Sequence, residues 1–143
     1  MKNDLEKAKE LLSRGGYTCV LCKGETVYTA TERGVKPLVD WILEHQETAG
    51  FSAADKVVGK AAALLYVRME VAAVYAKVMS RAAAETLQRY DIAATYDVMA
   101  EAVRNRAGTG LCPMEQTVMN IEEPNAALDA IRAKMKQMSE QLK

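Results

Sequence analysis

The sequence predicts an α/β fold in which helices pack against a mixed β-sheet. Residues 17–30 have the pattern of an antiparallel hairpin, and helical and strand-like segments alternate after residue 50. Strand–helix–strand units pair their strands in parallel, so the two patterns together predict a sheet with both kinds of pairing. The length of 143 residues fits one domain, residues 1–143, with a sizeable buried core.

The first half of the chain begins with a predicted helix over residues 3–13, where apolar residues repeat on one face before two glycines. The hairpin follows, because two runs rich in β-branched and aromatic residues flank "KGE" at residues 23–25. A second helix is expected over residues 35–45, with Leu38 and Trp41 directed toward the core.

A third helix is predicted to start at Ser52, because Asp55 three residues later gives the form of an N-terminal capping box. This helix would continue through "KVVGKAAALLYVRM", with Lys56 and Lys60 on one face. Gly59 inside a helix costs about 1 kcal/mol relative to alanine, which indicates that something approaches closely there. Packing on the sheet and a ligand or loop over the helix start are the two interpretations.

The second half of the chain alternates between strands and helices. Residues 70–79 form a continuous apolar run, which predicts a strand buried on both faces. A helix over residues 80–91, a short strand over 92–96 and a helix over 97–106 are expected to follow. The C-terminal helix, about residues 124–142, carries an apolar stripe suited to packing on the domain or on another subunit. A homodimer is therefore one of two alternatives for this helix.

The composition excludes several classes of partner. Nineteen basic residues balance nineteen acidic ones, so we expect no nucleic-acid partner. The longest apolar run, residues 61–67, is far shorter than the roughly 20 residues of a membrane span, and the charged N-terminus does not resemble a secretion signal. We therefore predict a cytoplasmic protein with no membrane partner, and three cysteines fit such a reducing compartment.

The sequence contains only one histidine and three cysteines, which restricts the metal and redox sites that it can form. A single histidine, His45, excludes a two-histidine zinc site within one chain. Cys19 and Cys22 form a C-x-x-C motif, but residues i and i+3 of a strand point to opposite faces. We interpret both as packing cysteines rather than a redox or metal pair. No metal site and no cofactor are predicted.

The stretch "NRAGTGLCPMEQ", residues 105–116, contains the strongest candidate site. Its glycine turn, formed by Gly108, Thr109 and Gly110, is expected to leave backbone N–H groups facing an anion. Arg106 just before the turn adds positive charge. We therefore expect these four residues to bind an anionic ligand.

Pro113 suits the first position of a helix, which places Cys112 at the N-cap. A cysteine there meets the positive end of the helix dipole, which favours the thiolate over the thiol. Glu115 is then either a capping-box carboxylate or an acid–base partner of Cys112.

Three segments carry a resemblance to a known family. "RGVKPLVDWI", "DKVVGKAAALL" and "NRAGTGLCPMEQ", in this order and spacing, resemble an uncharacterised bacterial and archaeal family catalogued as domain of unknown function 1893. The resemblance covers about Leu5 to Ala133. It implies a three-layer α/β/α, cytidine-deaminase-like fold, with helices on both faces of a mixed, mostly parallel sheet. It implies no established activity.

The implied fold invites a comparison with zinc deaminases, which place H-x-E at the start of one core helix and P-C-x-x-C at the start of the next. In the predicted helices Asp55 takes the first position, and Val57 stands in place of the catalytic glutamate. At the second position Cys112 remains, and Glu115 replaces the other cysteine. Valine cannot transfer protons, and this set of residues is a poor match for zinc. We therefore do not expect hydrolytic deamination.

The leading hypothesis for function is a small-molecule binding protein with a deaminase-like pocket that lacks the zinc site. Its ligand would be a nucleotide-like or other anionic metabolite, held by the Gly108–Cys112 turn, Asp55 and Lys56.

A second hypothesis is an enzyme or sulfur carrier in which Cys112 is the nucleophile. Glu115 or Asp55 would transfer protons, and Lys60 or Arg106 would hold an anion. A formate-dehydrogenase accessory family of the same broad fold carries sulfur on cysteines, which is the analogy behind a persulfide role. A third hypothesis is a non-catalytic interaction protein that oligomerises through the C-terminal helix.

Overall fold

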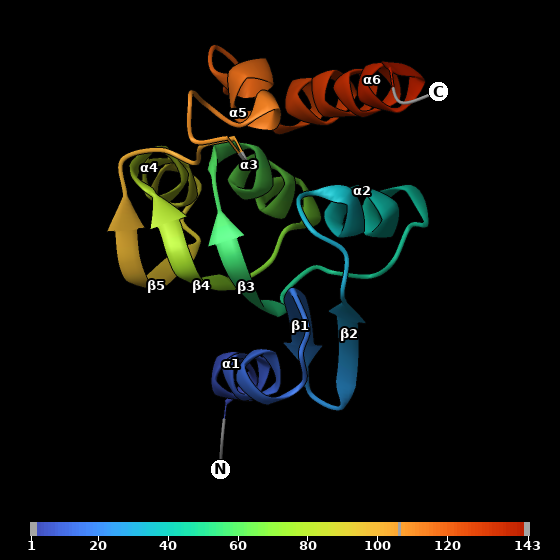
Figure 1. Cartoon of the computed structure of the whole chain (residues 1–143). Helices are drawn as coiled ribbons and strands as arrows, with labels where there is room; N and C mark the ends of the chain where they lie inside the picture. The colour runs from blue at the N-terminus through green and yellow to red at the C-terminus, as the bar shows by residue number, and fades with distance from the viewer. Residues whose placement is uncertain (1–2, 106, 142–143) are drawn as a thin grey trace.

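The computed structural model describes residues 3–105 and 107–141 and contains a five-stranded mixed sheet with helices on both faces (Figure 1). The strands are β1 (Cys19–Lys23), β2 (Thr26–Ala30), β3 (Ser52–Val58), β4 (Ala73–Ser80) and β5 (Ala93–Ala100). Their order in the sheet is β2-β1-β3-β4-β5. β1 pairs antiparallel with both β2 and β3, whereas β3, β4 and β5 run parallel to one another. The predicted mixed sheet is confirmed.

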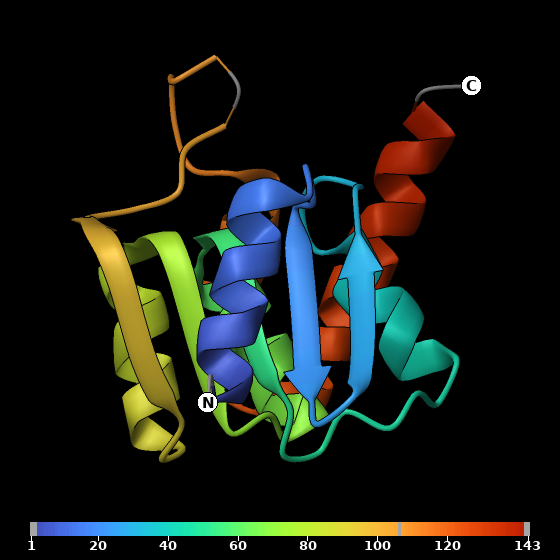
Figure 2. The ribbon, with the colours of Figure 1, turned by 90° about the horizontal axis from the view of Figure 1, so that it is seen from below.

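The helices divide between the two faces of this sheet. They are α1 (Asp4–Arg14), α2 (Lys36–Leu43), α3 (Lys60–Met69), α4 (Arg81–Arg89), α5 (Pro113–Val118) and α6 (Pro124–Gln141). Of the described helices, α1 alone lies on the face shown in Figure 2, where it packs on β1 and β3. On the other face lie α2, α3 and α4, and α5 and α6 pack on α3 as an outer layer (Figure 1).

Two apolar cores follow from this arrangement. The larger core lies between the sheet and α2–α4, and α1 covers the smaller one on the opposite face. Cys19 belongs to the larger core and Cys22 to the smaller, so the two thiols point to opposite faces as predicted. Among the described residues, no helix is both long and apolar enough to span a bilayer.

The helix predicted to start at Ser52 is wrong for its first seven residues. Ser52–Val58 form β3, in the middle of the sheet, and α3 begins only at Lys60. The Ser52–Asp55 capping box therefore does not exist, and Lys56 and Lys60 do not share a helix face. Pairing with β1 on one side and β4 on the other satisfies this backbone, which overrides the local helical pattern.

The helix predicted over residues 97–106 is also wrong for residues 97–105, and Arg106 lies outside the described residues. β5 continues to Ala100, because its parallel pairing with β4 extends to Ser80 and Ala100. Good helix formers such as Met99 and Ala100 therefore lie in a strand, since long-range pairing outweighs their intrinsic preference. The chain then leaves the sheet and returns to α5.

The C-terminal helix packs on its own chain. Ala127, Leu128 and Ile131 of α6 are buried in the larger core, and Met135 packs against it. This contact accounts for the first half of the predicted apolar stripe, with α3 and α5 as the packing partners.

Candidate functional site

A pocket lies where the connections of the sheet change direction. β1 continues directly into β2, which forms one edge of the sheet. β3 continues through α3 into β4, toward the opposite edge. Open α/β sheets bind ligands at such switch points, beyond the carboxyl ends of their parallel strands. The pocket has a volume of about 290 Å³. Its lining residues are Thr18, Cys19, Arg33, Gly34, Val35, Asp55, Lys56, Val57, Gly59, Ala61, Ala62, Val103, Cys112, Met114 and Glu115.

Asp55 is the acidic group at the inner end of this pocket. The antiparallel register of β1 and β3 places it directly opposite Cys19. One carboxylate oxygen, Oδ2, accepts a hydrogen bond of 2.7 Å from the Tyr66 hydroxyl, and Oδ1 accepts one of 2.8 Å from the backbone N–H of Lys56. Burial raises the pKa of Asp55 from 3.8 to about 6, although these hydrogen bonds favour the charged form.

Tyr66 and Cys19 extend the hydrogen bonding of Asp55 into the core. Tyr66 is fully buried in α3, and its Oη lies 3.1 Å from Sγ of Cys19. Burial and the charge of Asp55 raise the pKa values of both the Tyr66 phenol and the Cys19 thiol well above their usual range. Both groups are therefore protonated at neutral pH. With Asp55 ionised, the Tyr66 hydroxyl donates to the carboxylate and the Cys19 thiol donates to Tyr66.

Two cationic side chains stand at the mouth of the pocket. Arg33 precedes α2, Lys56 follows Asp55 in β3, and both are exposed. Within the described part of the chain, neither the Arg33 guanidinium nor the Lys56 ammonium has an ion-pair or hydrogen-bond partner. The pocket therefore joins an acidic inner end to a basic rim.

Glu115 forms one wall of the pocket by capping a different helix from its own. Its Oε1 accepts a hydrogen bond of 2.7 Å from the backbone N–H of Lys60, and Oε2 accepts one of 2.9 Å from that of Ala61. These are two of the donors that the first turn of α3 cannot satisfy internally, at the positive end of its dipole. This contact replaces the predicted capping box within its own helix, and the role of Glu115 as a proton-transfer partner of Cys112 stays a prediction.

Gly59 makes that contact possible. It is the N-cap residue of α3 and has an extended backbone, so its conformation does not require glycine. A Cβ added there would overlap the Glu115 carboxylate, so any side chain at this position would have to displace it. The prediction that something approaches Gly59 closely is confirmed, and the approaching group is the Glu115 carboxylate.

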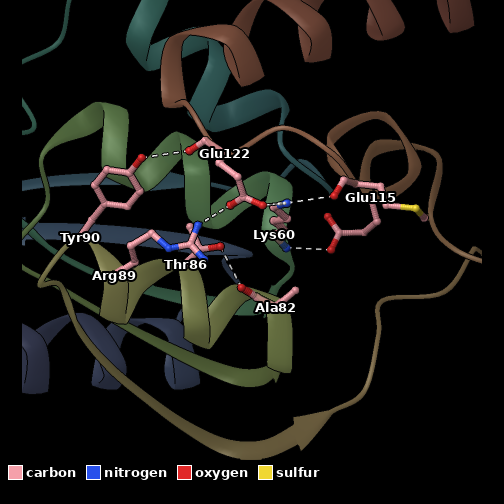
Figure 3. A network of polar contacts seen from close by, with 8 residues as sticks. Lys60, Ala82, Thr86, Arg89, Tyr90, Glu115 and Glu122 are labelled. Carbon is pink, nitrogen blue, oxygen red and sulfur yellow. Dashed lines mark hydrogen bonds and ion pairs between the residues drawn. The ribbon is translucent and has the colours of Figure 1, made fainter.

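Lys60 belongs to a second contact that fixes α5 and α6 on α3 (Figure 3). Its side chain is 11% exposed and donates to the carbonyl oxygen of Met119 at 3.1 Å and to Glu122 Oε1 at 2.9 Å. Arg89 binds the other carboxylate oxygen of Glu122, and the Tyr90 hydroxyl donates to its backbone carbonyl. Hydrogen bonds from Lys60 and Arg89 lower the pKa of Glu122. Lys60 is therefore directed away from the pocket, contrary to its predicted position at the ligand.

Cys112 is half-buried and lines the pocket. It occupies the predicted N-cap position of α5, with Pro113 following. The backbone N–H of Cys112 donates to the carbonyl of Val103, and an isolated bridge pairs Arg104 with Leu111. These contacts make the preceding segment a short hairpin that brings Cys112 back to the sheet.

The glycine turn forms the tip of this hairpin and lies outside the pocket lining. The backbone N–H of Gly108 donates to the carbonyl of Asn105, and that of Thr109 donates to the Asn105 side chain. Two of the N–H groups predicted to face an anion are therefore used within the turn. Gly110 is likewise absent from the pocket lining, and Arg106 lies outside the described residues.

Comparison with known proteins assigns a family. A family model described as "Domain of unknown function (DUF1893)", with the name TM1506, matches residues 7–135. The chain belongs to the DUF1893 family. A crystal structure of a DUF1893 family protein, TM1506 from Thermotoga maritima, is similar to this chain with a TM-score of 0.84 and 26% identity, over 94% of this chain and 91% of that one. No functionally curated protein matches the sequence.

The residue correspondence with zinc deaminases drawn from the sequence does not survive in this DUF1893 structure. Asp55 and Val57 lie in β3 and not at the start of a helix. Among the described residues, no three His, Cys, Asp or Glu side chains are grouped to hold a metal ion. Asp55, Lys56 and Cys112 nevertheless line one pocket together with Glu115, whereas the glycine turn that was predicted beside them lies outside its lining.

Sequence reasoning missed two residues of the DUF1893 pocket lining, Arg33 and Cys19, and the buried Tyr66 that contacts Asp55 behind it. Arg33 lies in a loop that meets β3 only in the folded chain, and Tyr66 looks like one more apolar position of a helix. Cys19 was interpreted as packing alone. The register of β1 against β3 is the signal that connects Cys19 to Asp55, and no local pattern contains it.

Removing the Glu115 carboxylate is expected to destabilise the protein. Glu115→Ala leaves the N–H groups of Lys60 and Ala61 without partners and should lower the free energy of unfolding by about 1–3 kcal/mol. Gly59→Ala should have a similar effect, because its Cβ displaces the same carboxylate. Urea denaturation checks both, with Glu140→Ala on the exposed end of α6 as the control. Fully additive losses in the double variant would contradict a shared contact.

Asp55 is expected to oppose folding at neutral pH. Its pKa is about 6 in the folded protein and 3.8 as the ordinary value, so the penalty is complete above about pH 6 and absent below about pH 4. Asp55→Asn should therefore raise the free energy of unfolding by about 1–3 kcal/mol at pH 8, at about 1.4 kcal/mol per unit of pKa difference, and leave it unchanged near pH 4.

Denaturant unfolding at the two pH values measures this difference. Asp97→Asn is the matched control, because Asp97 also accepts a hydrogen bond from a tyrosine hydroxyl, Tyr75, but is exposed. A loss of stability in Asp55→Asn at pH 8 would contradict the expectation.

Proposed function

We propose that this protein binds a small anionic metabolite in the pocket between β1, β3 and the starts of α2 and α3. The observation that carries the proposal is Asp55, a carboxylate kept in a costly, largely desolvated position at the inner end of a switch-point pocket. Groups with such perturbed pKa values collect at functional sites, because structural stability alone favours their removal.

The basic rim supplies the reason for an anionic ligand. Arg33 and Lys56 have no partner among the described residues and stand beside the pocket mouth. The amino ends of α2 and α3 also face this region, and the positive ends of helix dipoles favour anions. Because Glu115 already occupies the first turn of α3, the free charges of the rim are the stronger attraction for a ligand.

The size of the pocket limits the ligand. A volume of about 290 Å³ is at the lower end of the roughly 300–1,000 Å³ found for small-molecule sites. It suits one ring system with its substituents and is too small for a dinucleotide.

The cytidine-deaminase-like architecture is part of the same proposal. It is supported by the five-stranded mixed sheet with helices on both faces and by a pocket at the starts of two helices, α2 and α3. In this interpretation the deaminase pocket is retained for binding without the zinc ligands.

A thermal-shift screen with nucleoside monophosphates and small aromatic carboxylates tests the binding proposal. We expect at least one such anion to raise the melting temperature, and Arg33→Glu or Lys56→Glu to weaken its binding about tenfold or more, since each removes a charge-assisted contact. Lys77→Glu, which changes an exposed strand lysine elsewhere, is the control. The absence of any shift, or an equal shift in all three variants, would sink the proposal.

A cysteine-dependent activity is the second candidate, and the position of Cys112 favours it. Cys19 and Cys22 are buried, whereas Cys112 is half-exposed at the N-cap of α5 and opens on the pocket. A thiol that lines a pocket can reach a bound ligand, and cysteine is a common nucleophile in enzymes.

Alkylation kinetics test this second candidate. If Cys112 is activated by the fold, iodoacetamide should modify it about tenfold faster in the protein than in the free peptide "NRAGTGLCPMEQ". Mass spectrometry identifies the modified residue, and Cys112→Ser is the control. Equal rates in protein and peptide would rule out activation.

A further inference from the structure

Among the described residues, Asp55 at the inner end of the pocket has no cationic partner. Its oxygens accept hydrogen bonds from the Tyr66 hydroxyl and the backbone N–H of Lys56, and hydrogen bonds from the Val57 backbone and the Cys19 thiol also lower its pKa. No lysine or arginine is paired with Asp55 in the described part of the chain. A ligand that reaches Asp55 therefore meets a carboxylate whose charge no described side chain neutralises.

The surroundings of Asp55 favour a flat group over a compact ammonium. Val35, Val57, Ala61 and Ala62 form apolar pocket walls, which can contact the faces of a ring but cannot replace the water around an ammonium. An ammonium ion also has three N–H donors, whereas the two oxygens of the carboxylate lie side by side in one plane. Two adjacent N–H groups in the plane of a flat ligand can each donate to one of these oxygens.

The outer end of the pocket has the opposite character. The exposed cations Arg33 and Lys56 stand there, and Lys56 directly follows Asp55 in β3. The Asp55 carboxylate is directed inward, since it contacts the buried Tyr66 hydroxyl, whereas Lys56 is exposed to the solvent. A ligand that fits both ends carries N–H donors on its inner edge and negative charge on its outer side.

We propose that the pocket takes a flat nitrogen heterocycle that presents two adjacent N–H donors to Asp55 and an anionic substituent to Arg33 and Lys56. This inference rests on the proposed function and names its ligand class. The 2-amino-4-oxopyrimidine ring of guanine and of pterins has such an edge, formed by a ring N–H and an exocyclic amino group. A ring of this kind fits a pocket of about 290 Å³, with its charged substituent at the rim.

Two matched pairs of compounds test the donor edge by calorimetry at neutral pH. Guanosine monophosphate is compared with xanthosine monophosphate, and pterin-6-carboxylate with lumazine-6-carboxylate. In the second member of each pair a carbonyl replaces the amino group. We expect the amino compound of at least one pair to bind about tenfold or more tightly, since a lost hydrogen bond to a charged group costs roughly 1.5–3 kcal/mol. The pair that binds identifies a guanine nucleotide or a pterin as the source of the ring.

Asp55→Asn gives a sharper readout than loss of binding. The asparagine keeps an acceptor for the backbone N–H of Lys56 and presents an amide donor, which suits the carbonyl compound. The variant should therefore reverse the preference within the pair, an outcome that misfolding cannot produce. Asp97→Asn should keep the original preference.

Equal affinities within both pairs, or an unchanged preference in Asp55→Asn, would overturn the proposed ligand class. If other anions still bind through Arg33 and Lys56, the ligand class fails while the proposed function stands. If no anionic compound binds, both fail together.

Discussion

The contact between the Glu115 carboxylate and the first turn of α3 is the interaction on which the rest of the site depends. It joins a residue of α5 to backbone N–H groups 54 and 55 positions earlier, of Ala61 and Lys60. Gly59 provides the space for it, and Lys60 adds a second link through its side chain to Met119 and Glu122. Because α5 is held there, Cys112 and Met114 close one wall of the pocket, and α6 finds its packing surface on α3.

This arrangement also explains why the pocket contains both charges and apolar walls. The amino end of α3 attracts an anion, and the chain supplies that anion itself in Glu115, so the helix start is structural. The remaining polar groups of the pocket, Asp55 inside and Arg33 and Lys56 at the rim, are not needed for that packing. The raised pKa of Asp55 predicts a cost in stability at neutral pH, which is expected of a group kept for function rather than for packing.

The correctly predicted elements are those whose signal is local. Apolar periodicity and the flanking glycines located α1, the turn at Gly24 located the β1–β2 hairpin, and Pro113 located the start of α5. Two segments were predicted as helices but form strands, Ser52–Val58 and residues 97–100, and both contain good helix formers. Both lie in strands because parallel pairing with β4 decides their conformation, and that pairing leaves no local pattern in the sequence.

The sequence by itself determined that Cys112 stands at the N-cap position of a helix, that Cys19 and Cys22 point to opposite faces, and that something approaches Gly59 closely. Each of these depends on the geometry of a few neighbouring residues. Only the tertiary structure decided that the approaching group is Glu115, that Lys60 points away from the pocket, and that Asp55 meets Tyr66 and Cys19. Those contacts depend on the register of strands and the packing of helices far apart in the chain, which residue spacing does not encode.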